Sequence, residues 1–298
     1  MNRRALAALA AVTVALSLGG CSEEAPADSD RIVLSPPSEG AGGADHTHAP
    51  GQEHAAAAPV GDGTVASAGG YSLTAVQVPA VGKPGDVSFR ILDESGTAVT
   101  KYVPEQTKLL HLYVVRSDLS EFRHLHPELG EDGTWRARAD LGAAGSWRVV
   151  AEFTPEGASQ PFVLGTTVDV PGAWERVAVP QGEDATVSDD GVVRVRLLGA
   201  GTVSKNGRLR LAVTNLDDQP LTLGTFLGAS AHLTGFALES RGFVHVHPYG
   251  APEVTDDGTV LTFHTTFTEP GDYRFFVQVR VDGLLHQVAV TATVAPAP

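Results

Sequence analysis

The sequence predicts an all-β protein with two immunoglobulin-like β-sandwich domains in tandem. Short runs of alternating apolar and polar residues recur between turn-forming residues, and helical periodicity is nowhere sustained. The 33 glycines and 19 prolines among 298 residues would interrupt longer elements. Five such runs in one stretch of about a hundred residues and six in the next approach the roughly seven strands per hundred residues, twice over, that are typical of two immunoglobulin-like sandwiches.

The predicted strands fall into two groups. The first domain, 71–171, contains runs at 71–78, 87–92, 108–115, 146–153 and 162–170. The second domain, 191–298, contains runs at 192–198, 208–213, 229–238, 259–267, 273–281 and 284–294. Residues 172–190 are rich in proline, glycine and acidic residues, and they are predicted to form the linker between the domains.

The N-terminus has the features of a lipoprotein signal peptide, residues 1–20. Arg3 and Arg4 precede an apolar run at 5–18, which is too short to span a bilayer comfortably. The residues Leu18-Gly19-Gly20-Cys21 resemble a bacterial lipobox. Cleavage before Cys21 and lipidation of its sulfur would anchor the chain to the extracytoplasmic face of the cell membrane. The alternative is an ordinary signal peptide with an incidental cysteine.

Residues 21–70 are predicted to form a disordered tether. Ala, Gly, Pro, Ser and acidic residues dominate this segment and it has no aromatic residue, so it cannot bury enough surface to offset the entropy of ordering. His46, His48 and His54 could bind a divalent metal loosely there, or they are solvated side chains of a linker.

Composition excludes several classes of function. The 35 acidic residues outnumber the 21 basic ones, which argues against nucleic acid as a partner. Processing would remove the single methionine, and lipidation would consume the single cysteine, so sites that need sulfur ligands or thiol catalysis cannot be built. The sequence has no nucleophile elbow, His-Glu-x-x-His motif or phosphate-binding loop, so we expect no enzyme. A metal-dependent hydrolase is the remaining enzymatic alternative.

The two halves share a histidine pattern that indicates an internal repeat. His111 is followed 13 residues later by the first histidine of His124-Leu-His126-Pro127, and His232 stands at the same spacing before His245-Val-His247-Pro248. An Asp-Gly-Thr turn and a closing strand follow in each half. A duplicated domain explains these identical spacings economically.

Strand geometry predicts that each set of three imidazoles converges. Residues i and i+2 of a strand share a face, and a turn at 117–120 would place His111 directly opposite His126. A turn at 238–241 would place His232 opposite His247 in the same way. Three imidazoles suit zinc, copper(II) or nickel(II), and copper or zinc is the metal we expect.

The second repeat is the preferred site of the two. The predicted metal ligands there are His232, His245 and His247, with His286 or His264 as a fourth, and the second or vestigial site is His111, His124 and His126. The competing interpretation is a structural or protein-interaction module of the cell envelope, in which the histidines are packing residues. Solvent-accessible imidazole nitrogens without hydrogen-bond partners would favour metal binding, whereas rings bonded to backbone carbonyl groups and covered by aromatic residues would favour the packing role.

The chain also resembles a family of secreted actinobacterial proteins. The resemblance rests on segments 109–119, 124–127, 227–233, 245–248 and 271–276, and it extends over nearly all of the chain beyond the tether. Members of that family are often labelled heavy-metal-associated, and their activity is uncharacterised. The resemblance implies a secreted two-domain architecture and metal binding, and it transfers no catalytic residue.

The lipid anchor can be tested by replacing Cys21. Because Cys21 is the only cysteine in the chain, the Cys21→Ser variant should appear in the soluble fraction when cells are fractionated, whereas the parent protein sediments with membranes. Continued membrane association of the variant would contradict lipid anchoring.

Overall fold

A computed structural model describes residues 58–199 and 201–297, apart from the side chains of 204–207, 245 and 247. All described residues belong to one compact unit of the chain. The predicted signal peptide, Cys21 and tether histidines lie outside the described residues. Across the described ranges the secondary structure is strand with one short 3-10 helix, and no helix there is long and apolar enough to cross a membrane.

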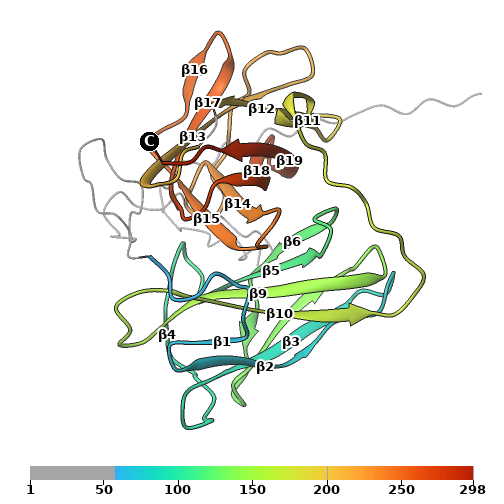
Figure 1. Ribbon diagram of the computed structural model, residues 1–298, viewed down its shortest axis with the longest axis vertical. Coiled ribbons are helices and arrows are strands. Elements are labelled where there is room, and N and C mark those ends of the chain that lie inside the picture. Colours follow the sequence, from blue (N-terminus) through green and yellow to red (C-terminus); the bar gives the residue numbers. More distant parts are fainter. Residues whose placement is uncertain (1–57, 200, 298) are drawn as a thin grey trace, which may run out of the picture. The chain divides into compact units, whose positions relative to one another are not determined.

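The first half is a sandwich of two antiparallel sheets (Figure 1). One sheet has the strand order β1-β2-β3-β8-β7, and the other has β10-β9-β5-β6 with β4 paired to β9. The strand bounds are β1 Ser67–Ala68, β2 Tyr71–Gln77, β3 Gly85–Leu92, β4 Tyr102–Val103, β5 Leu110–Arg116, β6 Phe122–Leu125, β7 Glu128–Leu129, β8 Thr134–Ala139, β9 Gly145–Pro155 and β10 Phe162–Val170.

The second half is one continuous antiparallel sheet that folds over on itself. Its order is β11-β12-β13-β17-β15-β14-β18-β19, with β16 paired to β17, and β15 joins its two layers by pairing with both β14 and β17. The bounds are η1 Glu183–Thr186, β11 Val187–Asp189, β12 Arg194–Gly199, β13 Ser204–Thr214, β14 Ala231–Ala237, β15 Phe243–Pro248, β16 Glu253–Thr255, β17 Gly258–Phe267, β18 Gly271–Val281 and β19 Leu284–Val294.

Each half has its own apolar core between its layers. Phe89, Trp135 and Trp147 lie in the first core, and Phe263 and Phe275 lie in the second. The prediction of two immunoglobulin-like sandwiches in tandem is therefore confirmed. Every run predicted from the sequence coincides with one of the longer strands, although their ends differ by a few residues.

A third apolar cluster contains residues of both halves. In β5 and β14 every residue is buried, because alternate side chains face the core of their own sandwich and the other alternate set faces this shared cluster. Phe122 of the first half stacks on Phe276 of the second with ring centroids 4.3 Å apart, and Tyr113 lies 4.7 Å from Phe243. These side chains form the repeat interface, whose members are Tyr113, Val115, Leu119, Phe122, Val150, Val163, Phe236, Phe243 and Phe276.

The last part of the predicted tether is ordered. Val60 forms a parallel bridge to Phe162, Gly63 donates its N–H to the carbonyl of Val163, and β1 pairs with β2. Residues 58–70 thus pack along β10 and β2. The sequence did not predict this contact because the segment gains its apolar partners from β10, about a hundred residues away in the chain.

Both predicted hairpin registers are confirmed. Leu112 pairs with Leu125 in the first half, and Leu233 pairs with Val246 in the second. The turns close where Arg116 bonds to Glu121 and where Ala237 bonds to Gly242. The same even-length turn in each repeat therefore sets the same register.

The close approach of the segment 58–70 to β10 gives a stability test. A Cβ added at Gly165 would lie 2.0 Å from the carbonyl oxygen of Gly63, so Gly165→Ala must displace backbone. Overpacking of this kind costs about 1–3 kcal/mol. Urea unfolding should show that loss for Gly165→Ala and a change under about 0.5 kcal/mol for the control Gly199→Ala, which has open space around its Cβ position. Equal stability of the two variants would show that the segment does not pack on β10.

Candidate metal centre

Three imidazoles of the first repeat converge at one end of β5 and β6. His111 lies on β5, His124 lies on β6, and His126 follows the last residue of β6. One ring nitrogen from each residue can be chosen so that the three atoms lie within 4.8 Å of one another. The hairpin register brings these side chains together as the sequence predicted.

A tight turn holds His111 by its outer nitrogen. The Nε2 atom of His111 lies 3.0 Å from the carbonyl oxygen of Glu105. A carbonyl oxygen only accepts hydrogen bonds, so in the neutral ring Nε2 carries the proton and Nδ1 carries the lone pair. Gln106 and Thr107 have φ of 44° and 70°, and Glu105 and Lys108 bond to each other across them, as in a type I′ turn.

The second repeat builds the same support for His232. Its Nε2 atom lies 2.8 Å from the carbonyl oxygen of Phe226, which stands six residues earlier just as Glu105 does before His111. Leu227 and Gly228 have φ of 52° and 81°, so the turn also has the I′ form. Thr107 keeps this left-handed backbone although it is β-branched, a strained arrangement that concentrates at functional sites.

A chain of amides fixes the orientation of His124. The Nε2 of Gln287 donates to the carbonyl of Phe122 at 3.3 Å, and the Nε2 of Gln278 donates to Oε1 of Gln287 at 3.1 Å. Oε1 of Gln278 then accepts from Nδ1 of His124 at 2.9 Å. Because the chain ends on a carbonyl oxygen, both amide orientations follow from it, and His124 carries its lone pair on Nε2.

These two tautomers bring lone pairs face to face. Nδ1 of His111 and Nε2 of His124 are 3.0 Å apart. Each ring carries its proton on the other nitrogen, which donates to a carbonyl oxygen on the far side of the ring. A cation between the two nitrogens, either a proton or a metal ion, removes this repulsion. Two nitrogen ligands of a tetrahedral zinc lie about 3.3 Å apart, close to the separation seen.

The environment favours the metal ion over the proton. Burial lowers the pKa of His124 well below its usual value, and His111 and His126 lower it further through repulsion between positive charges. Burial, with His111 and Lys108, lowers the pKa of His126 to about 3. His124 and His126 therefore stay neutral at physiological pH, which is the form that binds metals.

The third ring supplies another inward nitrogen. Nε2 of His126 is buried and has no hydrogen-bond partner among the residues that the structure describes. A buried polar atom without a partner costs about 1–3 kcal/mol, so such atoms are rare unless a function or an ion accounts for them.

Aromatic side chains cover the same rings. Tyr113 stacks on His124 with ring centroids 4.6 Å apart, and Phe226 stands edge-on to His232 at 5.2 Å. The hydroxyl of Tyr113 donates to the buried carboxylate of Glu152 at 3.0 Å, and burial raises the pKa of Tyr113 well above its usual value. The cluster thus combines features of both interpretations: carbonyl bonds and aromatic cover outside, and inward nitrogens at the centre.

The other predicted ligands are only partly defined. In the backbone register His245 pairs with Thr234 and His247 pairs with His264, but the side chains of His245 and His247 lie outside the described parts of the structure. Metal binding by His232, His245 and His247 as a set therefore remains a prediction.

The prediction of His286 as a fourth ligand is not supported by its position. His286 pairs with the core residue Val279, whereas His232 pairs with Gln278, so the two histidines face opposite sides of the sheet. Nδ1 of His286 instead lies 2.8 Å from Oδ2 of Asp190. His264 packs near Tyr249, with ring centroids 6.1 Å apart.

Sequence reasoning missed two buried polar residues that pair with the first histidine of each repeat. Gln278 is paired with His232 in the second repeat, and Glu152 is paired with His111 in the first. Each is a buried polar residue, Glu152 on β9 and Gln278 on β18. Comparing the two closing strands residue by residue could have revealed both positions as repeat-equivalent polar sites.

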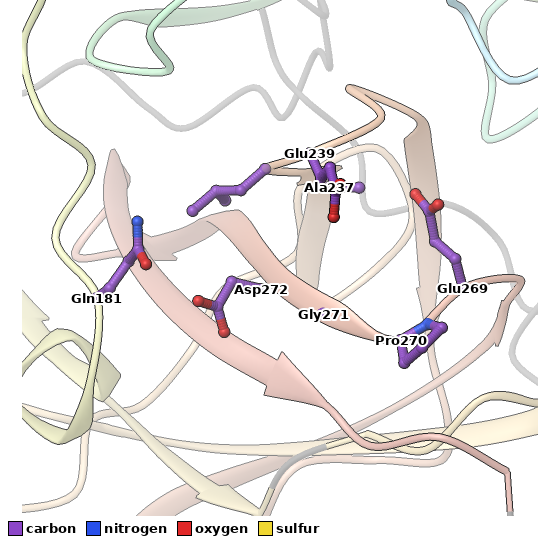
Figure 2. Close-up of a pocket in the computed structure, with 8 residues that line it drawn as sticks. Gln181, Ala237, Glu239, Glu269, Pro270, Gly271 and Asp272 are labelled. Carbon is purple, nitrogen blue, oxygen red and sulfur yellow. The ribbon is translucent and has the colours of Figure 1, made fainter.

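One pocket of the structure lies away from the histidines. It has a volume of about 380 Å³ and is lined by Gln181, Ala237, Leu238, Glu239, Glu269, Pro270, Gly271 and Asp272 (Figure 2). Two of its carboxylates have partners, since Glu269 accepts from the hydroxyl of Ser240 and Asp272 from that of Thr293. We assign no function to this pocket.

The fold and the cluster define a duplicated β-sandwich protein with histidines grouped at its repeat interface. The chain belongs to the family described as Domain of unknown function (DUF8832), whose model matches residues 65–170 and 185–296. The two matched segments correspond to the two halves, which confirms the duplication. A search of curated proteins found no match.

Solved structures similar to this chain are remote. The bacterial integrin-binding protein invasin shares 16% identity with a TM-score of 0.22, over 76% of this chain and 39% of that one, so the chain spans less than half of the invasin structure. The Clostridium thermocellum CbhA fibronectin(III)-like modules share 11% identity with a TM-score of 0.19, and the match covers 76% of this chain and 95% of that one. An endo-fucoidan hydrolase of glycoside hydrolase family 107 shares 14% sequence identity with a TM-score of 0.20, and the match covers 73% of this chain and 32% of that one. No functional argument rests on these similarities.

The low pKa of His126 predicts a pH dependence of stability. The ordinary pKa of histidine is 6.5 and that of folded His126 is about 3, so the unfolded chain binds this proton more readily. The metal-free protein should lose stability as the pH falls from about 6.5 towards 3, with no contribution from this group above that window. Urea unfolding in EDTA at pH 7 and 4.5 should show a smaller loss for His126→Phe than for the parent, and equal losses would contradict the neutral buried state.

Proposed function

We propose that the protein binds a divalent transition metal through His111, His124 and His126. The observation that carries this proposal is the 3.0 Å contact between Nδ1 of His111 and Nε2 of His124, two atoms whose lone pairs face each other because each ring donates its proton to a carbonyl group. The buried Nε2 of His126 supplies a third nitrogen. Outer hydrogen bonds that fix imidazole tautomers are typical of metal sites.

The ring positions also support a shared ion. An imidazole bound to zinc has its centre about 3.2 Å from the metal, so the centres of two rings in tetrahedral coordination lie about 5 Å apart. The ring centroids of His111, His124 and His126 are separated by 5.3, 5.0 and 4.6 Å. Small shifts of the side chains would bring all three rings onto one ion.

The donor atoms narrow the choice of metal. Neutral imidazole suits zinc and copper(II), whereas copper(I) carriers and iron–sulfur sites use thiolate or thioether sulfur, which the mature chain would lack. We propose zinc or copper(II) as the ion. Among the residues that the structure describes we identify no general base of known role beside the proposed site, so we propose a binding protein and not an enzyme.

A structural or interaction module is the second candidate. It is favoured by the carbonyl bonds of His111 and His232 and by the aromatic cover of Tyr113 and Phe226. In that case the histidines hold the two sandwiches together without a metal.

We further propose that the module is anchored at Cys21 on the extracytoplasmic face of the membrane, as the lipobox and the tether composition suggest.

Zinc titration by calorimetry distinguishes these candidates. The variant His124→Ala should lower the affinity for zinc by at least about a hundredfold, because it removes one of three ligands and the partner of Gln278. The matched control replaces His46, His48 and His54 of the predicted tether with alanine and should keep the high-affinity site. Loss of binding in the control alone would assign the metal to the tether, and absence of binding in the parent would favour the packing role.

A further inference from the structure

The second repeat reaches into the histidine cluster of the first. Gln278 accepts the hydrogen bond from His124, and the ring of His232 lies 5.8 Å from that of His124, centroid to centroid. Phe226 stands edge-on to His126 at 6.5 Å. Three side chains of one repeat thus contact the imidazoles of the other.

The carbonyl bond of His232 fixes which of its ring nitrogens carries the lone pair. Its Nε2 atom bonds to the carbonyl of Phe226, so the neutral ring carries its lone pair on Nδ1, as His111 does. His232 is 2% exposed, so its ring lies in the interior beside the histidine cluster. The separation of 5.8 Å from His124 lies near the roughly 5 Å expected for two rings on one tetrahedral ion.

We propose that the metal site is shared between the two repeats, with His232 as a fourth ligand beside His111, His124 and His126. This inference rests on the proposed metal binding by the first three. Gln278, on the strand next to His232, acts as a positioning residue because it fixes the tautomer of His124 from the opposite repeat. The bound ion then links the two sandwiches directly.

Linkage to the repeat interface follows from this arrangement. The stack of Phe122 on Phe276 and the contact of Tyr113 with Phe243 hold the same two sheets together beside the histidines. An ion bound by both repeats stabilises that interface, and by reciprocity the interface strengthens ion binding. A site confined to the first repeat would show no such coupling.

The test measures zinc affinity in the full mature protein. His232→Gln should lower the affinity at least about tenfold, because the amide can still donate to the Phe226 carbonyl but offers no imidazole lone pair. The matched control His286→Gln changes a histidine of the same repeat that faces the other side of the sheet and bonds to Asp190, and it should stay within about twofold of the parent. Unchanged affinity of His232→Gln with loss in His124→Ala would overturn the shared site and leave the proposed function standing.

A second measurement does not depend on how the variants fold. In the parent protein loaded with cadmium-113, nuclear magnetic resonance should show coupling of the metal to four imidazole nitrogens, one of them Nδ1 of His232. Coupling to three nitrogens, all from the first repeat, would overturn the inference. If the parent binds none of zinc, cadmium and copper(II), the proposed function itself fails, so the two failures are distinguishable.

Discussion

The site depends on how two imidazole rings share their protons. His111 and His124 each give a proton to an acceptor on the outer side of the ring, and their inner nitrogens are left 3.0 Å apart. Neither acceptor can reverse its role, since one is a backbone carbonyl and the other is an amide oxygen fixed by a chain that ends on the carbonyl of Phe122. The fold therefore holds two lone pairs in repulsive contact, and a cation bound between them removes the repulsion. Burial lowers the pKa of His124, which disfavours a proton as that cation.

Duplication explains why groups from both halves lie around His124. In each repeat the strand that carries the first histidine is buried on both faces, so one face builds the local core and the other meets the second repeat. His111 and His232 both point to that second face, each held by a type I′ turn six residues earlier. The closing strands then differ, with Glu152 in one repeat and Gln278 in the other, and this difference gives His124 a neutral partner.

Much of the fold and the local geometry of the site could be predicted from the sequence. Period-two alternation located the long strands, and identical spacing of the histidines gave the hairpin registers, because an even-length turn leaves one register that keeps both histidine pairs on one face. The meeting of the two repeats could not be predicted, since it depends on which outer faces pack together. For the same reason the sequence did not reveal Gln278 as a hydrogen-bond partner of His124. It also did not show that His286 and His232 lie on opposite faces of their sheet, which follows from the pairing of β18 with β19. Residues 58–70 were assigned to the tether because their composition is that of a linker, although contacts with distant β10 order them.

The most direct test of the account is to locate the ion by anomalous scattering at the zinc absorption edge, in crystals of the protein grown with one equivalent of zinc. The account predicts one strong peak about 2.0–2.1 Å from Nδ1 of His111 and Nε2 of His124, with Nε2 of His126 also bound. A peak at other residues, or no peak between these two nitrogens in zinc-saturated crystals, would contradict it.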